Sequence, residues 1–243
     1  MDQKYYNISY AESPFGTLNQ YMTRTYSWMA AGLLVTFATA LLTVTTPLFE
    51  LMFSTGLVFL LSIAELVLVA VLSARVERLQ PTTATGLFFA YAVLNGINLS
   101  TYFIIYDLST LILAFLVGTV YFGVMAVYGA RTQRDLSGWG INLMGALIAI
   151  ILTSLVGGLI GMLTGASFGM MDIVLCAVSV LVFMLFTAYD TQKLSQLYSY
   201  YAGDSELAEK ASIYGALTLY LDFINIFLYV VRLLGLNSRN SRS

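Results

Sequence analysis

Long apolar stretches, separated by short polar segments, follow one another along almost the whole chain. They predict membrane-spanning helices at about residues 25–47, 51–74, 84–106, 109–130, 141–164, 172–194 and 211–234. Each stretch reaches the length of about 20 residues that a helix needs to cross the hydrocarbon core. The pattern therefore predicts an all-α membrane protein built as a bundle of seven transmembrane helices.

The segments outside these stretches are short and polar. We predict a polar cytoplasmic tail at residues 1–24, the seven-span membrane domain at 25–234 and a short C-terminal tail at 235–243. The tail lacks the apolar core of a signal peptide, so we expect the first span to act as its own insertion signal. Before the last span, Gly203 is expected to end one helix and Asp204 or Ser205 to cap the next.

Composition agrees with a protein that has lipid as its solvent. Hydrophobic residues make up 59% of the chain, charged residues only 10%, and the mean hydropathy is +0.82. A soluble domain carries about 25% charged residues, which are needed to cover a surface that faces water. The net charge of −2 does not indicate the basic surface that binding to a nucleic acid requires.

Basic residues are confined to alternate loops, and this sets an orientation. The tail and the second, fourth and sixth loops carry Lys and Arg. The first, third and fifth loops contain neither, and their only charged residues are acidic. The basic positions are Lys4, Arg24, Arg75, Arg78, Arg131, Arg134, Lys193 and Lys210, and the acidic ones are Glu50, Asp107 and Asp172. By the positive-inside rule the N-terminus is cytoplasmic.

One feature conflicts with this orientation. Seven crossings place the C-terminus outside, yet Arg232, Arg239 and Arg242 lie at that end. A last segment that re-enters the membrane without crossing it would remove the conflict. We favour a seventh crossing, because this segment is as long and as apolar as the others.

Three carboxylates are predicted to lie inside the membrane: Glu65, Asp190 and Asp222. A bare carboxylate at the bilayer centre costs roughly 3 kcal/mol or more, so each must face the interior, pair or carry a proton. For Glu65 the alternative to a functional role is a protonated side chain bonded to a neighbouring backbone. For Asp190 the alternative is a solvated helix end beside Lys193, unless the sixth helix continues towards Tyr201.

A single polar stripe marks the last helix. Gly215, Thr218, Asp222, Asn225 and Tyr229 share one face, and every other face is apolar. A lone polar stripe is expected to point into the bundle, which makes the last helix the central one. An interhelical hydrogen-bond seam would produce the same stripe.

Two further patterns are interpreted mainly as packing. Tyr91, Asn95, Asn98 and Tyr102 share one face of the third span and line either a water-filled path or, as we favour, a packing seam. The fifth span holds small residues at 157, 161 and 165, which serve either dimerisation or, preferably, close packing inside the bundle. A monomer is therefore expected rather than a dimer.

Enzyme chemistry is not indicated. The chain has no His, and its single Cys lies in an apolar run, so Ser-His-Asp, Cys-His and His-ligated metal sites are excluded. We see no phosphate loop and no pair of nucleophile and base. We expect neither catalysis nor a cofactor.

Three segments resemble the Bax inhibitor-1 family, also called the transmembrane Bax-inhibitor-motif family, and its bacterial branch most closely. They are TAYDTQK in the sixth span, LYLDFINIFLYVVRLLG in the seventh and RDLSGWG after the fourth. The resemblance covers the chain from about Tyr21 onward. It implies a seven-helix bundle with the last helix central, in the inner (plasma) membrane of a cell.

The resemblance also implies an activity and a set of residues. The activity is a pH-sensitive Ca²⁺ leak, in which Asp190 and Asp222 share a proton-dependent hydrogen bond and would transiently meet the ion. Glu65 corresponds to a glutamate on the ion path. Arg75 corresponds best to an arginine that latches the closed state, with Arg78 as the alternative because the spacing from the glutamate is one residue short.

Elementary chemistry agrees with a carboxyl-based switch. Two carboxyl groups in contact cannot both ionise cheaply in a low dielectric, so they respond to pH without a His. Carboxylate and amide oxygens suit a hard ion such as Ca²⁺. We expect Thr218 and Asn225, on the same stripe as Asp222, to lie on the ion path with Glu65. The residues alone predict only a proton-coupled or cation-handling membrane protein.

Two other functions are weighed against the channel. One is a regulatory membrane protein that conducts nothing and binds a membrane protease or another partner. The other is a proton-coupled transporter, which would show saturation and counter-flow. We therefore predict that a pH-sensitive Ca²⁺ leak channel is gated by the two aspartates, and keep these alternatives open.

Overall fold

The computed structural model describes residues 16–75, 78–165, 169–201 and 203–240, and none of these residues lies in a β-strand. In chain order the α-helices are α1 (Leu18–Thr45), α2 (Leu48–Ser54), α3 (Leu57–Arg75), α4 (Pro81–Ile105), α5 (Leu108–Arg131), α6 (Trp139–Thr164), α7 (Gly169–Tyr201) and α8 (Ser205–Asn240). Six of them are long and apolar enough to cross a membrane, and α2 with α3 would make a seventh if the bent pair counts as one span.

The second predicted span is not a straight helix. The expected stretch 51–74 is divided into α2 and α3, whose axes differ by 89°. Gly56 lies at the break with a φ of 72°, a left-handed conformation that costs other residues about 1–2 kcal/mol. Apolar periodicity could not reveal the bend, because both helices on either side of Gly56 are apolar. The remaining six predicted spans each correspond to one helix, with ends shifted by up to seven residues. α1 begins at Leu18, so the predicted tail of residues 1–24 was drawn too long.

The last two helices are longer than predicted, because the connection between them is tight. α7 continues to Tyr201, and Asp204 caps α8 by accepting hydrogen bonds from the backbone N–H groups of Glu206 and Leu207 at 2.9 and 3.1 Å. α7 therefore ends shortly before Gly203, and Asp204 caps α8, as the sequence predicted. Residues 1–15 and 241–243, which belong to the two predicted tails, lie outside the described residues.

The chain divides into two compact units, and α7 and α8 each contribute to both. The first unit contains the chain up to Ile105 together with Leu194–Tyr220, and the second contains Tyr106–Lys193 together with the chain from Leu221.

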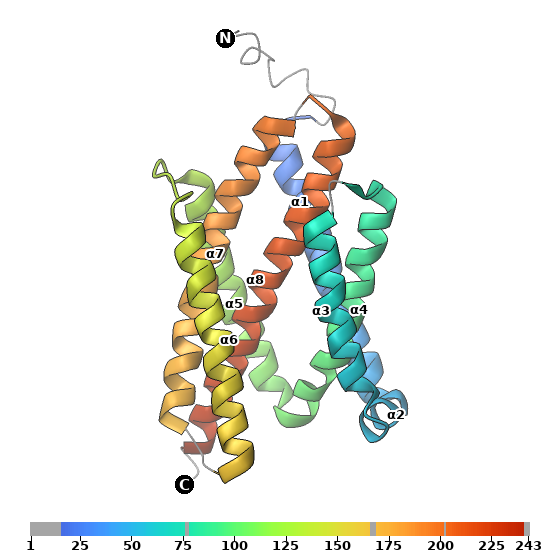
Figure 1. Cartoon of the computed structure of the whole chain (residues 1–243), viewed down its shortest axis with the longest axis vertical. Coiled ribbons are helices and arrows are strands. Elements are labelled where there is room, and N and C mark those ends of the chain that lie inside the picture. The colour runs from blue at the N-terminus through green and yellow to red at the C-terminus, as the bar shows by residue number, and fades with distance from the viewer. Residues whose placement is uncertain (1–15, 76–77, 166–168, 202, 241–243) are drawn as a thin grey trace. The chain divides into compact units, whose positions relative to one another are not determined.

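In the first unit, α4 packs along both α1 and α3 (Figure 1). At Gly96 the backbones of α4 and α1 come so close that a Cβ atom there would lie 2.5 Å from the carbonyl oxygen of Thr36. Tyr220 of α8 fills the core, with its ring edge-on to Phe88 and Tyr91 and its hydroxyl 2.6 Å from that of Thr36.

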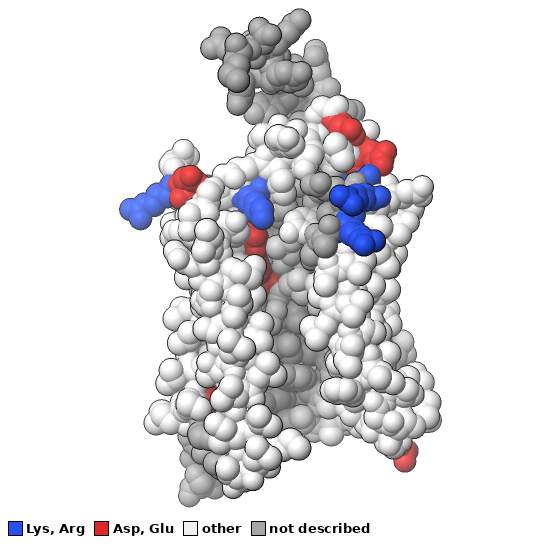
Figure 2. Space-filling view, in the orientation of Figure 1, with Lys and Arg blue, Asp and Glu red and all other residues white. Residues whose placement is uncertain are grey.

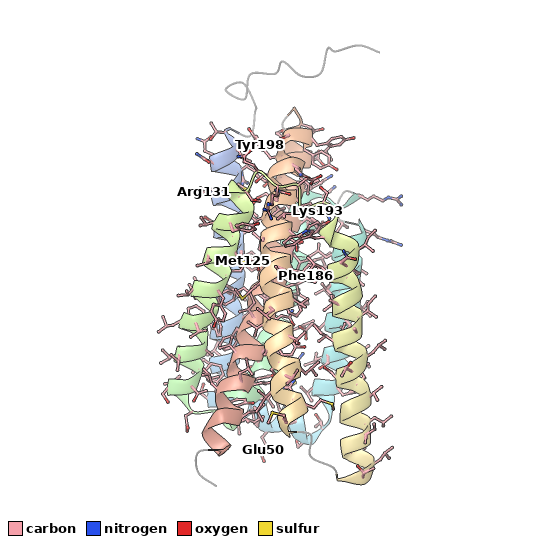
Figure 3. All side chains as sticks on the ribbon, turned by 90° about the vertical axis from the view of Figure 1, so that its left-hand side faces the viewer. Glu50, Met125, Arg131, Phe186, Lys193 and Tyr198 are labelled. Atoms are coloured by element: carbon pink, nitrogen blue, oxygen red, sulfur yellow. The ribbon has the colours of Figure 1, made fainter. Side chains whose placement is uncertain are left out.

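The second unit has a similar close crossing. A Cβ atom at Gly129 of α5 would lie 2.2 Å from the carbonyl oxygen of Ala188 on α7. Phe223 of α8 packs edge-on against two phenyl rings of α5. Figure 3 shows Arg131 of α5 and Lys193 of α7 towards the same end of this unit, with Met125 and Phe186 deeper along the same helices.

Helix α6 corrects the interpretation of the fifth span. Gly157 does not mediate close packing: a Cβ atom there would meet nothing within 4 Å among the described residues, and the same holds for Gly165, which ends the helix with a φ of 68°. Only 11% of the 18-residue apolar stretch of α6 is buried. The side of the molecule that α6 forms shows few charged residues in Figure 2. The small-residue pattern indicated a contact that this helix does not make within the described chain.

Helix α8 is the most buried of the six candidate spans, since half of its 18-residue apolar stretch is buried inside the protein. The polar stripe is not its only buried face: Leu217, Leu219 and Ile226 are fully buried, whereas Thr218 and Asn225 are only half-buried. A helix covered on nearly every side is what a central position requires. The place of α8 among all the other helices stays a prediction.

Candidate functional site

Two aspartates meet in the second unit. Asp190 comes from α7 and Asp222 from α8, and their side chains are in hydrogen-bond contact. Asp190 is 7% exposed and Asp222 is 4% exposed, so both carboxyl groups are removed from solvent. The solvated alternative for Asp190 is therefore wrong, because α7 continues well beyond it and keeps the side chain inside.

The contact between two carboxyl groups has a chemical requirement. The Oδ2 atom of Asp222 is buried and receives no hydrogen bond from any described N–H or O–H group. Carboxylate oxygens only accept, so two of them bond to one another only if a proton lies between them. A proton carried by one of the two carboxyl groups would supply the hydrogen bond that this oxygen lacks.

Thr187 was not identified from the sequence, yet it contacts the pair. Its side chain is buried, in hydrogen-bond contact with Asp222, and its Oγ1 donates to the carbonyl of Phe183 at 2.9 Å. Thr187 lies three residues before Asp190, so both belong to one face of α7. That spacing was a usable signal within the TAYDTQK segment.

Gln192 was also missed, and it ties this segment to the loop after α5. Its Oε1 accepts from the backbone N–H of Leu136 at 2.8 Å, and its Nε2 donates to the carbonyl of Arg134 at 2.8 Å. The loop is shaped in turn by Asp135, whose carboxylate accepts from Ser137; these hydrogen bonds lower the pKa of Asp135. The two sequence segments RDLSGWG and TAYDTQK are thus one structural feature.

Lys193 is the basic residue that acts on the pair. Its charge attracts that of Asp190, and its ammonium lies 5.7 Å from the ring centre of Tyr189 on the same helix. No group of three or more His, Cys, Asp or Glu side chains could hold a metal ion in the part of the chain that the structure describes. A cation at Asp190 and Asp222 would therefore need further oxygens from neutral groups or water.

Glu65 forms a second cluster, in the first unit. Asn95 Nδ2 lies 2.5 Å from Oε1 of Glu65, Asn98 Nδ2 donates to Oε2, and Tyr91 also hydrogen-bonds to the carboxylate. The polar stripe of the third span, which we interpreted as a packing seam, therefore binds a carboxylate. The available signal was this stripe, with its spacing of three to four residues, but the pairing of α3 with α4 had to be known to use it.

The other predicted residues are not brought to either cluster by a described bond. Arg75 ends α3 with an exposed side chain and Arg78 is also exposed, so the latch stays a prediction. Thr218 donates to the carbonyl of Tyr214 and Asn225 to that of Leu221, so both bond to their own helix.

Comparison with known proteins shows similarity along nearly the whole chain. Residues 18–239 match the family model described as inhibitor of apoptosis-promoting Bax1. The chain is 42% identical to the inner membrane protein YbhL of Escherichia coli over 226 residues, which cover 91% of this chain and 94% of that protein. It is 40% identical to a protein of Deinococcus radiodurans, with 93% and 94% covered, and 38% identical to one of Rickettsia prowazekii, with 90% of both covered.

Proposed function

Because the chain belongs to the Bax inhibitor-1 family, we propose that this multi-pass membrane protein is a pH-sensitive leak channel for Ca²⁺, gated by Asp190 and Asp222. The observation that carries the proposal is the buried contact between the two carboxyl groups, with an Asp222 oxygen that lacks a donor. Such a contact holds α7 against α8 only while a proton is shared.

The gate follows from the charge of the pair. When pH rises and the shared proton leaves, two negative charges face one another in a low dielectric and repel. α7 and α8 then separate at this point, and Lys193 stabilises the charge left on Asp190. When pH falls, both carboxyls are neutral and the contact is retained.

The test is Ca²⁺ flux into proteoliposomes across a pH series, with Asp190→Asn and Asp222→Asn. Asn keeps the shape and the hydrogen bonding of Asp but cannot ionise, so each variant is expected to flatten the pH dependence while still folding. Asp107→Asn is the matched control: Asp107 is exposed before α5 and its side chain makes no cap hydrogen bond. It is expected to behave like the wild type.

Two results would count against this function. If both Asn variants are folded and keep the wild-type pH dependence, the pair is not the sensor and Glu65 is the next candidate. If the wild type carries no Ca²⁺ at any pH, the channel fails and a regulatory protein that binds a membrane protease or similar partner becomes the leading function. Saturable flux with counter-flow would instead indicate a proton-coupled transporter.

A further inference from the structure

The bonds around Glu65 give each carboxylate oxygen its own donor. Oε1 accepts from Asn95 and Oε2 from Asn98, one turn apart on α4, while Tyr91 adds a hydroxyl from the turn before. This is the arrangement that a carboxylate anion takes when neutral dipoles replace water. The Glu65 side chain is only half-buried, so the cluster is also reachable from outside the packed core.

The negative charge of this cluster is not neutralised by a described basic residue. Within the described chain, the ion pairs of the first unit join Arg24 to Glu209 at 2.8 Å and Lys210 to Glu206 at 2.7 Å. Amide and hydroxyl dipoles solvate a charge without cancelling it. An uncompensated carboxylate on a spanning helix therefore attracts a cation.

The amide groups are positioned to change partner. Asn98 Nδ2 donates to Glu65, while its Oδ1 lies 3.2 Å from Ser62 Oγ, which can also donate to the carbonyl of Val58 at 2.9 Å, so this contact does not lock the amide. If the side-chain amide of Asn95 or Asn98 rotates by half a turn about its Cβ–Cγ bond, Oδ1 and Nδ2 exchange places. The amide oxygens then lie beside the carboxylate of Glu65, where a cation can bind them. With the hydroxyls of Tyr91 and Ser62, the cluster then offers about six oxygen atoms, the lower limit of what Ca²⁺ accepts.

We propose that Asn95 and Asn98 determine which cations this protein accepts at Glu65. Their amide nitrogens satisfy the carboxylate when the site is empty, and their oxygens bind the cation when it is occupied. A single negative charge with neutral oxygens binds a divalent ion weakly, as a site on a conduction path must if the ion is to leave again. The proposal rests on the proposed channel function and adds the residues that choose the ion.

The first test removes the amides. In proteoliposomes, the double variant Asn95→Leu and Asn98→Leu is expected to lower the ratio of Ca²⁺ flux to K⁺ flux at least about tenfold, because the cation loses two oxygen ligands. Asn142→Leu is the matched control, since Asn142 is exposed at the start of α6. It is expected to keep the wild-type ratio, and a ratio unchanged in the folded double variant would overturn the proposal.

The second test adds charge, and it stays decisive if the double variant does not fold. Asn95→Asp places a second carboxylate beside Glu65, so binding of radioactive Ca²⁺ to the purified protein is expected to tighten by roughly tenfold or more. In the channel, Ca²⁺ should then block K⁺ flux at lower concentration. Asn142→Asp is the control and is expected to bind Ca²⁺ as the wild type does.

The dependence on Glu65 separates this proposal from the channel itself. Adding Glu65→Gln to Asn95→Asp is expected to abolish the gain in Ca²⁺ binding, and a gain that survives would overturn the shared site. If the wild type carries no ion flux, the channel function fails, while the binding experiment on the same variants still decides whether Asn95 and Glu65 hold a cation together.

Discussion

A carboxyl group on a spanning helix needs hydrogen-bond partners, and the two acidic clusters supply them in opposite ways. Glu65 receives amide donors on both oxygens from α4, so it is satisfied as an anion. Asp222 instead faces a second carboxyl, with one oxygen lacking a donor, so its contact with Asp190 depends on a proton. The same functional group is thus hydrogen-bonded differently in the two clusters because different residues surround it.

Gln192 supports a prediction at this scale. Replacing it by Leu removes the partners of the Leu136 N–H and the Arg134 carbonyl, so we expect Gln192→Leu to lower the free energy of unfolding by about 1–3 kcal/mol. Denaturation in detergent measures the change. Gln196→Leu, at an exposed position on the same helix, is the control and is expected to change stability little.

The Gln192 prediction has a clear contrary result. If Gln192→Leu and Gln196→Leu unfold alike, the side chain does not hold the loop to α7. The two sequence segments RDLSGWG and TAYDTQK would then need another reason to occur together.

At the scale of helices, glycine serves two different purposes in this chain. Gly129 lets α5 approach the backbone of α7 directly, whereas Gly157 of α6 faces open space. Both lie inside apolar helices, and the sequence around them does not distinguish them. What differs is whether another backbone lies opposite.

The two glycines form a matched pair of predictions. A methyl group at Gly129 would overlap the Ala188 carbonyl, so we expect Gly129→Ala to destabilise the fold by about 1–3 kcal/mol. Gly157→Ala meets no atom and gains helix propensity, so we expect unchanged or slightly higher stability. Thermal unfolding of both variants in one detergent makes the comparison, and equal losses would mean that the α5–α7 crossing is looser than described.

For the whole molecule, one of the three arginines that conflicted with seven crossings, Arg232, lies within a helix. Arg232 belongs to α8 and its charge acts on Cys176, near the beginning of α7. The positive-inside rule counts basic residues in loops and near span ends, so Arg232, Arg239 and Arg242 still argue against an external C-terminus. The basic ends of α3 at Arg75 and of α5 at Arg131 are the opposing signal, and we give them more weight.

We therefore predict a cytoplasmic N-terminus and an external C-terminus. Reporter fusions after Ser243 should be active only in the form that reports the outside, and fusions in the loop between α5 and α6 only in the cytoplasmic form. A cytoplasmic signal at Ser243 would show that the last segment does not cross, and the bent pair α2–α3 would then be the first element to reconsider as a span.

The sequence by itself determined the lipid environment, the helical class, the family and the presence of three carboxylates within the apolar spans, because apolar runs of this length suit a bilayer and charged residues within them are rare and easy to find. It could not determine the bend at Gly56, the open surface beside Gly157 or the role of the α4 amides. Each of these depends on which helix lies opposite, and periodicity reports only the face of a helix. Tertiary structure decided that Asn95 and Asn98 meet Glu65, and that Asp190 meets Asp222 where α7 passes α8, because only packing brings side chains from distant helices within hydrogen-bond reach.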